Sequence, residues 1–200
     1  MIPVTPLPGA VGFDTDENVT GFLLPGAFVI RYLEAVTEAE CQYILSAGKA
    51  LGLCTFAEDF DGVAHAAKLA SLGYPKGCTV FLDVEGVTLD PVVLIQRIDT
   101  WAHTIRAQGY DPGKYHGPQS LLTSRELTAL AVDRYWKGAG RTVDRYDVEA
   151  APYSGYCVFQ LTNDSKTGDT ALDIPRGLVV DVDAVRRDFQ GRLPMWARAA

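Results

Sequence analysis

Two acidic side chains stand two residues apart at the end of an apolar run, and they are the first candidates for chemistry. Cys78 to Val84 is almost continuously apolar or β-branched, and glycines bound the stretch at Gly77 and Gly86. This composition predicts a buried parallel strand. Because side chains alternate between the two faces of a strand, Asp83 and Glu85 are expected to share one face. Burying carboxylates is costly, so the pair indicates either a compensated structural network or a catalytic site.

Composition excludes several functional classes. A chain of 200 residues is long enough for one domain, or at most two, with a substantial core. Its net charge of −7 and the lack of a basic run argue against a nucleic-acid-binding surface. The longest apolar segments are far shorter than the roughly 18 residues that a membrane span requires. The N-terminal stretch also lacks the basic and apolar regions of a secretory signal, which leaves the localisation open between retention in the cell, another export route and a trimmed chain.

The four cysteines do not indicate a metal site. Cys41, Cys54, Cys78 and Cys157 have neither a CxxC spacing nor clustered histidines beside them. We therefore expect small buried thiols, no zinc and no cofactor, while a disulfide stays open.

Strand-like and helix-like periodicities alternate along the chain. Thr37 followed by Glu40 is typical of a capping box, and Pro91 is typical of the first turn of a helix. We expect helices from Thr37 to about residue 51, and at 64–72, 91–108 and 124–131, with a last helical turn at 185–189. We expect strands at 11–15, 26–33, 52–58, 78–84, 114–117, 134–137, 156–161 and 178–183, and a polar surface loop at 138–155.

Eight strands alternating with helices, all expected to be parallel, predict an α/β fold: a compact (β/α)8 TIM-type barrel with some short or missing helices in the second half. The barrel would occupy residues 10–189 as a single domain, between an irregular lead-in at 1–9 and a C-terminal tail at 190–200 that carries Trp196. A doubly wound open sheet is the alternative, although no GxGxxG follows the first strand. In a barrel, strand-end acids meet at the carboxyl face, where we expect Asp14, Asp83, Glu85 and Asp181.

The order of several short motifs resembles the family 25 glycoside hydrolases, the Chalaropsis-type lysozymes. The motifs are Gly12-Phe-Asp14, Leu82-Asp83-Val84-Glu85, Phe159-Gln160-Leu161 and Val180-Asp181-Val182-Asp183. The chain is more similar still to a related glycoside-hydrolase-like domain of unknown function from actinobacteria and their phages. That likeness rests on Phe28 to Leu33, on Gly62 to Lys76 with Leu72-Gly73-Tyr74-Pro75, and on Lys114-Tyr115-His116-Gly117. Together the motifs span about residues 10 to 189.

The resemblance implies a barrel that cleaves, or descends from enzymes that cleave, the β-1,4 bond after N-acetylmuramic acid in peptidoglycan. Glu85 would be the general acid and Asp83 would stabilise positive charge at the sugar ring or orient the N-acetyl group. Asp14 and Asp181 would complete an acidic floor. Such chemistry needs one protonated and one ionised carboxyl, and crowded acids have pKa values that are pushed apart. Retention or inversion of the sugar stays open, and no metal is required.

A second group of residues could contact substrate, and each has a packing or structural alternative. Near predicted strand ends, aromatic faces could stack on sugar rings: Tyr32, Tyr115, His116 and Trp136. Arg31 is expected to pair with an acid of the floor, and Gln160 to bind substrate or to hold a loop. Asp183 shares a face with Asp181, so either could reach the site. His65 and His103 are expected on helices as surface or packing residues.

A non-catalytic glycan-binding or phage virion structural module on the same barrel is the alternative function. The Asp83 and Glu85 pair favours the enzyme, because a binding module has no need for a paired acid and base. In both cases the expected partner is a bacterial cell-wall glycan, and phage or cell-envelope proteins are further partners that the resemblance implies. The place of action would then be the cell wall or a virion.

Overall fold

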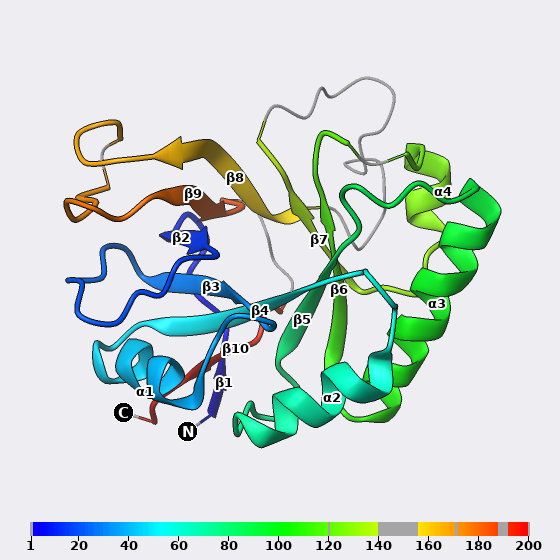
Figure 1. Ribbon diagram of the computed structural model, residues 1–200, viewed down its shortest axis with the longest axis horizontal. Helices are drawn as coiled ribbons and strands as arrows, with labels where there is room; N and C mark the ends of the chain where they lie inside the picture. Colours follow the sequence, from blue (N-terminus) through cyan, green and yellow to red (C-terminus); the bar gives the residue numbers. More distant parts are fainter. Residues whose placement is uncertain (1, 120, 140–155, 171, 188–191, 200) are drawn as a thin grey trace.

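Eight strands form a closed barrel (Figure 1). The computed structural model describes residues 2–119, 121–139, 156–170, 172–187 and 192–199. The ring is continuous because β4 pairs with both β3 and β5, and β9 pairs with both β8 and β2. This closure excludes the open doubly wound sheet. In pairing order the strands are β2 (Val11–Thr15), β3 (Phe28–Tyr32), β4 (Ala50–Phe56), β5 (Thr79–Asp83), β6 (Asp111–His116), β7 (Arg134–Lys137), β8 (Tyr156–Ser165) and β9 (Val180–Val185).

The expectation that all eight strands are parallel is wrong for β9. Each neighbouring pair from β2 through β8 is parallel, whereas β9 is antiparallel to both β8 and β2. Strands joined without a crossover helix return beside each other in opposite directions. The connection from β8 to β9 spans residues 166–179, and its described part contains no helix. The chain therefore returns down the barrel wall along β9.

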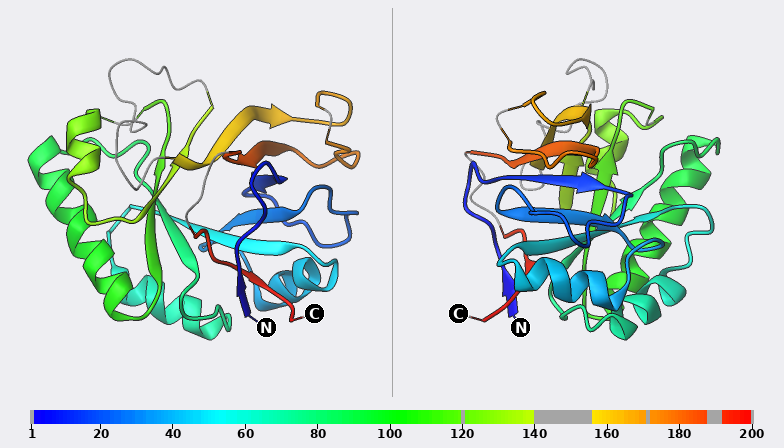
Figure 2. Two further views of the ribbon diagram at one scale, coloured as in Figure 1. Left: turned by 180° about the vertical axis from the view of Figure 1, so that it is seen from behind. Right: turned by 60° about the vertical axis from the view of Figure 1, so that its left-hand side comes forward.

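In the described part of the chain, four helices follow successive strands on the outside of the barrel. They are α1 (Glu38–Ser46) after β3, α2 (Gly62–Ser71) after β4, α3 (Pro91–Ala107) after β5 and the short α4 (Ser124–Thr128) after β6. In the described residues beyond β7 there is no helix, and Figure 2 shows β8 and β9 without a helix beside them. None of the described helices is long and apolar enough to cross a bilayer.

The helix caps agree only in part with the expected pattern. The Thr37 side chain caps α1 by accepting a hydrogen bond from Glu40 N at 3.2 Å. The Glu40 carboxylate does not complete the box, because it turns away to bind Arg31 and Val19 N. A complete capping box begins α4, where Thr123 and Glu126 satisfy each other's backbone N–H groups.

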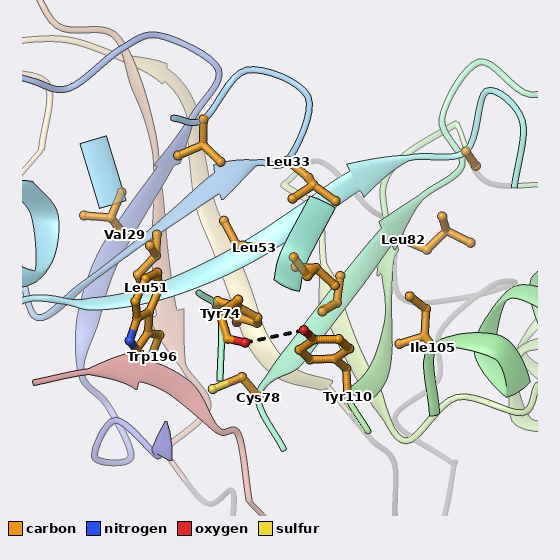
Figure 3. Packing of buried hydrophobic residues seen from close by; sticks show 14 of the residues in the cluster. Val29, Leu33, Leu51, Leu53, Tyr74, Cys78, Leu82, Ile105, Tyr110 and Trp196 are labelled. Carbon is orange, nitrogen blue, oxygen red and sulfur yellow. Dashed lines mark hydrogen bonds between the residues drawn. The ribbon is translucent and has the colours of Figure 1, made fainter. Parts of the chain in front are cut away.

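The buried apolar residues form an inner and an outer cluster. The inner cluster fills the barrel and includes Phe28, Phe81 and Trp136. At Gly12 an added Cβ would lie 2.6 Å from the Phe28 ring, so only glycine leaves room for that ring inside the barrel. The outer cluster packs strands against helices, and Figure 3 shows part of it around Tyr74, Tyr110 and Trp196. In that cluster the Tyr110 hydroxyl donates to Tyr74 O at 3.4 Å.

Both ends of the chain contain strands where irregular segments were expected. β1 (Ile2–Val4) pairs antiparallel with β10 (Met195–Ala197), and β10 pairs with β4 at Leu51. Leu193 and Met195 join the inner cluster, and Trp196 is 1% exposed. Figure 1 shows both ends at one side of the barrel. The C-terminal segment is thus part of the core rather than a loose tail, because its large apolar side chains need burial.

Two expected features fall partly outside the described residues. For the polar loop expected at 138–155, residues 140–155 lie outside them, and for the helical turn expected at 185–189, residues 188 and 189 do. Within the described part of that turn, Val185 is the last residue of β9.

The four cysteines are free and buried, as expected for small packing thiols. Burial raises the pKa of the Cys41, Cys78 and Cys157 thiols to about 12 and raises that of Cys54 as well. Neutral thiols of this kind act as small apolar groups.

We predict that Trp196→Ala lowers the free energy of unfolding by about 3–5 kcal/mol, because it empties a buried site between β1, β10 and β4. Denaturant unfolding would measure the loss. Arg198→Ala, at an exposed position two residues later, should change it by less than about 0.5 kcal/mol. Similar small effects for both variants would contradict the structural role of β10.

Candidate active site

Four carboxylates meet at the mouth of the barrel formed by the carboxyl ends of the parallel strands. Asp14 and Asp83 point inward near the ends of β2 and β5, and Glu85 follows two residues after β5. Asp181 lies near the start of β9, yet it is the register partner of Asp14. Because β9 runs antiparallel, the beginning of that strand reaches the same mouth as the ends of its neighbours. The sequence-predicted acids are therefore brought together, with Asp181 delivered by a reversed strand.

The side-chain amide of Gln160 on β8 joins two of these acids. Its Nε2 donates to Asp14 Oδ2 at 3.1 Å and to Asp181 Oδ2 at 2.8 Å. Its Oε1 accepts from the Tyr115 hydroxyl at 3.0 Å and from Ala139 N at 2.8 Å. All four hydrogen-bonding positions of the amide are thus used by the protein. Gln160 positions the acids and is not left with a free group for substrate.

A second acid pair lies one layer deeper in the barrel. Asp14 and Asp183 lie close enough for each to change the pKa of the other, and two acids in such contact do not readily ionise together. Trp136 Nε1 donates to Asp183 Oδ1 at 2.8 Å and fixes the inner member. Burial raises the pKa of Asp14 well above its usual range, helped by repulsion from Asp183, and burial raises the pKa of Asp183 to about 8. Asp183 is fully buried, so Asp181 is the acid of β9 that reaches the cleft.

Asp83 and Glu85 have contrasting environments. Asp83 is 4% exposed, and burial raises its pKa to about 6, although the hydrogen bond from Glu85 N at 2.8 Å and the charge of Lys114 act in the opposite direction. Burial likewise raises the pKa of Asp181 to about 6, opposed by a hydrogen bond from Asp164 N at 2.6 Å. Glu85 is half-buried, and within the described residues the hydrogen bond that it accepts comes from Gln119 N at 3.3 Å. It is the acid of the Asp83 and Glu85 pair that stays open to the cleft.

Gly117 leaves the space that Glu85 occupies. A Cβ added at Gly117 would lie 1.8 Å from Glu85 Oε1, so the carboxylate would have to move from its present position.

Two pockets share Phe56 as a wall. The first has a volume of 360 Å³, and its lining includes Asp14, Asp181 and Tyr32. The second has a volume of 500 Å³ and includes Glu85. Phe56 is 37% exposed and stacks on Tyr32 with ring centroids 4.4 Å apart. The ring of Phe56 therefore separates the side of the mouth that contains Asp14 and Asp181 from the side that contains Glu85.

Three expected substrate contacts lie elsewhere. Arg31 is buried on the outer face of β3, where Nε binds Glu40 Oε1 at 2.9 Å and the guanidinium also donates to Thr15 O, so its partner is not an acid of the floor. His116 is fully buried and stacks on Tyr156 of the outer cluster. Trp136 is fully buried inside the barrel. None of the three is placed to stack on a sugar in the open cleft.

The other expected side chains are nearer the site or serve as packing. Tyr32 lines the first pocket, and Tyr115 lies beneath the mouth, where its hydroxyl supports Gln160. His65 accepts a hydrogen bond from Trp101 Nε1 at 3.0 Å and so joins α2 to α3, whereas His103 lies exposed on α3.

The cleft residues that sequence reasoning missed include an aromatic side chain and three acids of the first pocket. Phe56 is one of them, and its alternation with the inward Cys54 on β4 could have revealed it. The other three acids that line the first pocket, Asp16, Glu17 and Asp164, lie in loops whose path the sequence does not specify. Within the described residues no group of three or more His, Cys, Asp or Glu side chains is arranged to hold a metal ion.

Comparisons with known proteins bear on the fold alone. No family model and no curated protein matches the chain. The crystal structure of an uncharacterised B. stearothermophilus protein is similar with a TM-score of 0.65 and 22% identity, covering 91% of this chain and 98% of that one. A Coccidioides immitis protein assigned as a fructose-1,6-biphosphate aldolase matches with a TM-score of 0.37 and 14% identity, over 57% of this chain and 46% of that one. That second likeness carries no argument.

The buried acids predict a pH dependence of stability. A carboxyl whose pKa is raised by folding stabilises the protein fully below its unfolded pKa of about 3.9, and the contribution is lost as the pH rises through the folded value. For Asp183 that value is about 8. Each such proton lowers the free energy of unfolding by up to about 1.4 kcal/mol per pH unit. We therefore expect Asp183→Asn, which keeps an acceptor for Trp136, to give a shallower decline above pH ~5.

Urea unfolding at a series of pH values measures this difference. Asp173→Asn, at an exposed position, serves as the control and should follow the wild-type curve. Parallel curves for wild type and Asp183→Asn would show that Asp183 carries no extra proton in the folded protein.

Proposed function

We propose that the protein is a glycoside hydrolase that cleaves the β-1,4 glycan of bacterial peptidoglycan, in the manner of a muramidase. The observation that carries the proposal is the pair formed by Asp83 and Glu85 at the barrel mouth. One carboxyl is buried and held by a backbone N–H, and the other opens onto a pocket. Glycoside hydrolysis uses two carboxyl groups in different roles, and this pair supplies one buried carboxyl beside one that faces a pocket.

Each acid is assigned a role in that reaction. Glu85 protonates the leaving oxygen, because it is the acid of the pair that is open to the cleft. Asp83, once ionised, stabilises positive charge that develops at the sugar ring or orients the N-acetyl group. Asp14 and Asp181 form the floor under that ring, held at a fixed spacing by Gln160. Tyr32 and Phe56 offer the apolar faces on which a sugar ring stacks.

We further propose that the closed barrel is a reduced (β/α)8 TIM-type barrel related to the family 25 glycoside hydrolases. Seven consecutive parallel strands and helices after four of them support this relationship. The related glycoside-hydrolase-like domains of actinobacteria and their phages lead us to propose the cell wall as the place of action. Phage or cell-envelope proteins are the partners that such a location implies.

Glu85→Gln should reduce the release of new reducing ends from purified actinobacterial peptidoglycan by about 10²- to 10⁴-fold, because the amide cannot donate the proton. Mass spectrometry of the muropeptides would identify the bond that is cleaved. Glu38→Gln, in the exposed first turn of α1, removes the same charge away from the mouth and should retain full activity.

A different result would identify a binding module. If neither wild type nor Glu85→Gln releases product while both sediment with the wall, the hydrolase proposal is wrong. The barrel would then be a non-catalytic glycan-binding protein.

The pH profile of kcat/KM should have a rising limb on the acidic side. The rate should rise as the pH increases through about 6, because Asp83 and Asp181 must lose their protons to stabilise positive charge. Asp83→Asn should lower the rate and remove most of the rising limb, and a wild-type rate independent of pH between about 4 and 8 would contradict these roles.

A further inference from the structure

The second pocket is larger than the first and differs from it in charge. Acids are the charged side chains of the first pocket, whereas Arg97 of α3 lines the second one together with Glu85 and Glu58.

Arg97 has no hydrogen-bond or ion-pair partner in the described part of the chain. Its guanidinium instead lies over the ring of Phe60, with Cζ 5.7 Å from the ring centroid. A cation over an aromatic face at this distance is held in place without using its N–H donors. The five donors of the guanidinium therefore remain available for a ligand with planar acceptor geometry, such as a carboxylate.

The backbone of Phe60, the residue whose ring contacts Arg97, adopts a strained conformation. Phe60 has a φ of 55°, a left-handed conformation that is uncommon for a bulky side chain. The O atom of Phe60 accepts a 2.9 Å hydrogen bond from Gly62 N where α2 begins, and the Asp61 side chain caps that helix. Phe60 lines both the second pocket and the neighbouring one, as Arg97 does. Strain of this kind concentrates at ligand-binding sites.

The position of Glu85 indicates which side of the scissile bond the second pocket would bind. A general acid donates its proton to the oxygen of the leaving sugar, so it contacts the leaving-group side of the scissile bond. Glu85 lines the second pocket, whereas Asp14 and Asp181 line the first. The leaving part of the glycan would therefore occupy the pocket that contains Arg97.

We propose that the second pocket binds the leaving-group side of the glycan, and that Arg97 pairs there with a carboxylate of the lactyl or peptide group on the muramic acid that follows the leaving N-acetylglucosamine. The direction of the strand rests on the proposed function, whereas the carboxylate site rests on Arg97 and Phe60. The preferred ligand is then a glycan whose lactyl or peptide substituents carry free carboxylates. A neutral N-acetylglucosamine polymer would leave the guanidinium without a partner.

Binding of two matched probes tests the inference. The first probe is a soluble peptidoglycan fragment with peptide stems that carry free carboxylates, and the second is the same fragment after amidation of those carboxylates. Titration calorimetry is carried out in the Glu85→Gln background, which prevents turnover. Arg97→Gln should weaken binding of the carboxylate probe about tenfold and leave binding of the amidated probe unchanged.

Two further variants separate the role of Arg97 from general charge. Lys68→Gln removes one positive charge from an exposed position on α2 and should leave both affinities unchanged. Arg97→Lys keeps the charge but not the planar fork, so it should lose part of the affinity for the carboxylate probe. Equal effects of Arg97→Gln on both probes, no effect on either, or no binding of either probe by the parent would overturn the inference.

The outcomes separate this inference from the proposed hydrolysis. If wild type releases no reducing ends but Arg97 still distinguishes the two probes, the hydrolase proposal fails and the carboxylate site holds. If product is released but Arg97→Gln leaves both affinities unchanged, the carboxylate site fails and hydrolysis holds.

Discussion

One side-chain amide connects the acids of the mouth to the rest of the barrel. Gln160 joins Asp14 on β2 to Asp181 on β9, and its oxygen is held by Tyr115 of β6 and by Ala139 N. The two N–H donors of the Gln160 amide thus hold the Asp14 and Asp181 carboxylates close together, although these carboxylates repel each other. Within the described residues the donors have no alternative partner. The positions of Asp14 and Asp181 depend on this arrangement, because each unsatisfied buried group would cost free energy of the order of 1–3 kcal/mol.

The interior that fills the barrel also sets the protonation of the site. Phe81, Tyr115 and Trp136 make the space beneath the mouth apolar, and burial is the main cause of each raised carboxyl pKa. A low pH favours the folded protein, since the protonated acids lose less hydration. Stabilisation of positive charge needs the ionised acids. The buried acids therefore favour stability when they are protonated and the proposed reaction when they are ionised. Such a conflict between stability and activity is common for active sites.

Alternation of side chains along strands explains why much of the site could be predicted from the sequence. The eight strands and the meeting of Asp14 with Asp181 follow from a period of two and from barrel closure, whereas Glu85 lies in the turn after β5 rather than on a strand face shared with Asp83. The direction of β9 could not be predicted, because it depends on how the connection from β8 packs. Arg31 was assigned to the acidic floor, but its partner Glu40 is on α1, and only the tertiary fold brings the two together. The role of Phe56 in the cleft was not predicted, because it depends on the stacking of this ring on Tyr32.

The pairing of β1 with β10 has a consequence for how the barrel can be attached to other structures. Both strands lie beside the beginning of β4, which is the end of the barrel opposite the mouth. Figure 2 shows the two ends of the chain next to each other in both views. A polypeptide or a particle joined to either terminus would lie at the end of the barrel opposite the mouth. The cleft of a tethered copy would therefore face away from the point of attachment. Because β1 and β10 pair with each other, a force applied between the two termini acts mainly on these two strands. The ring of strands that holds the acids lies largely outside this line of force.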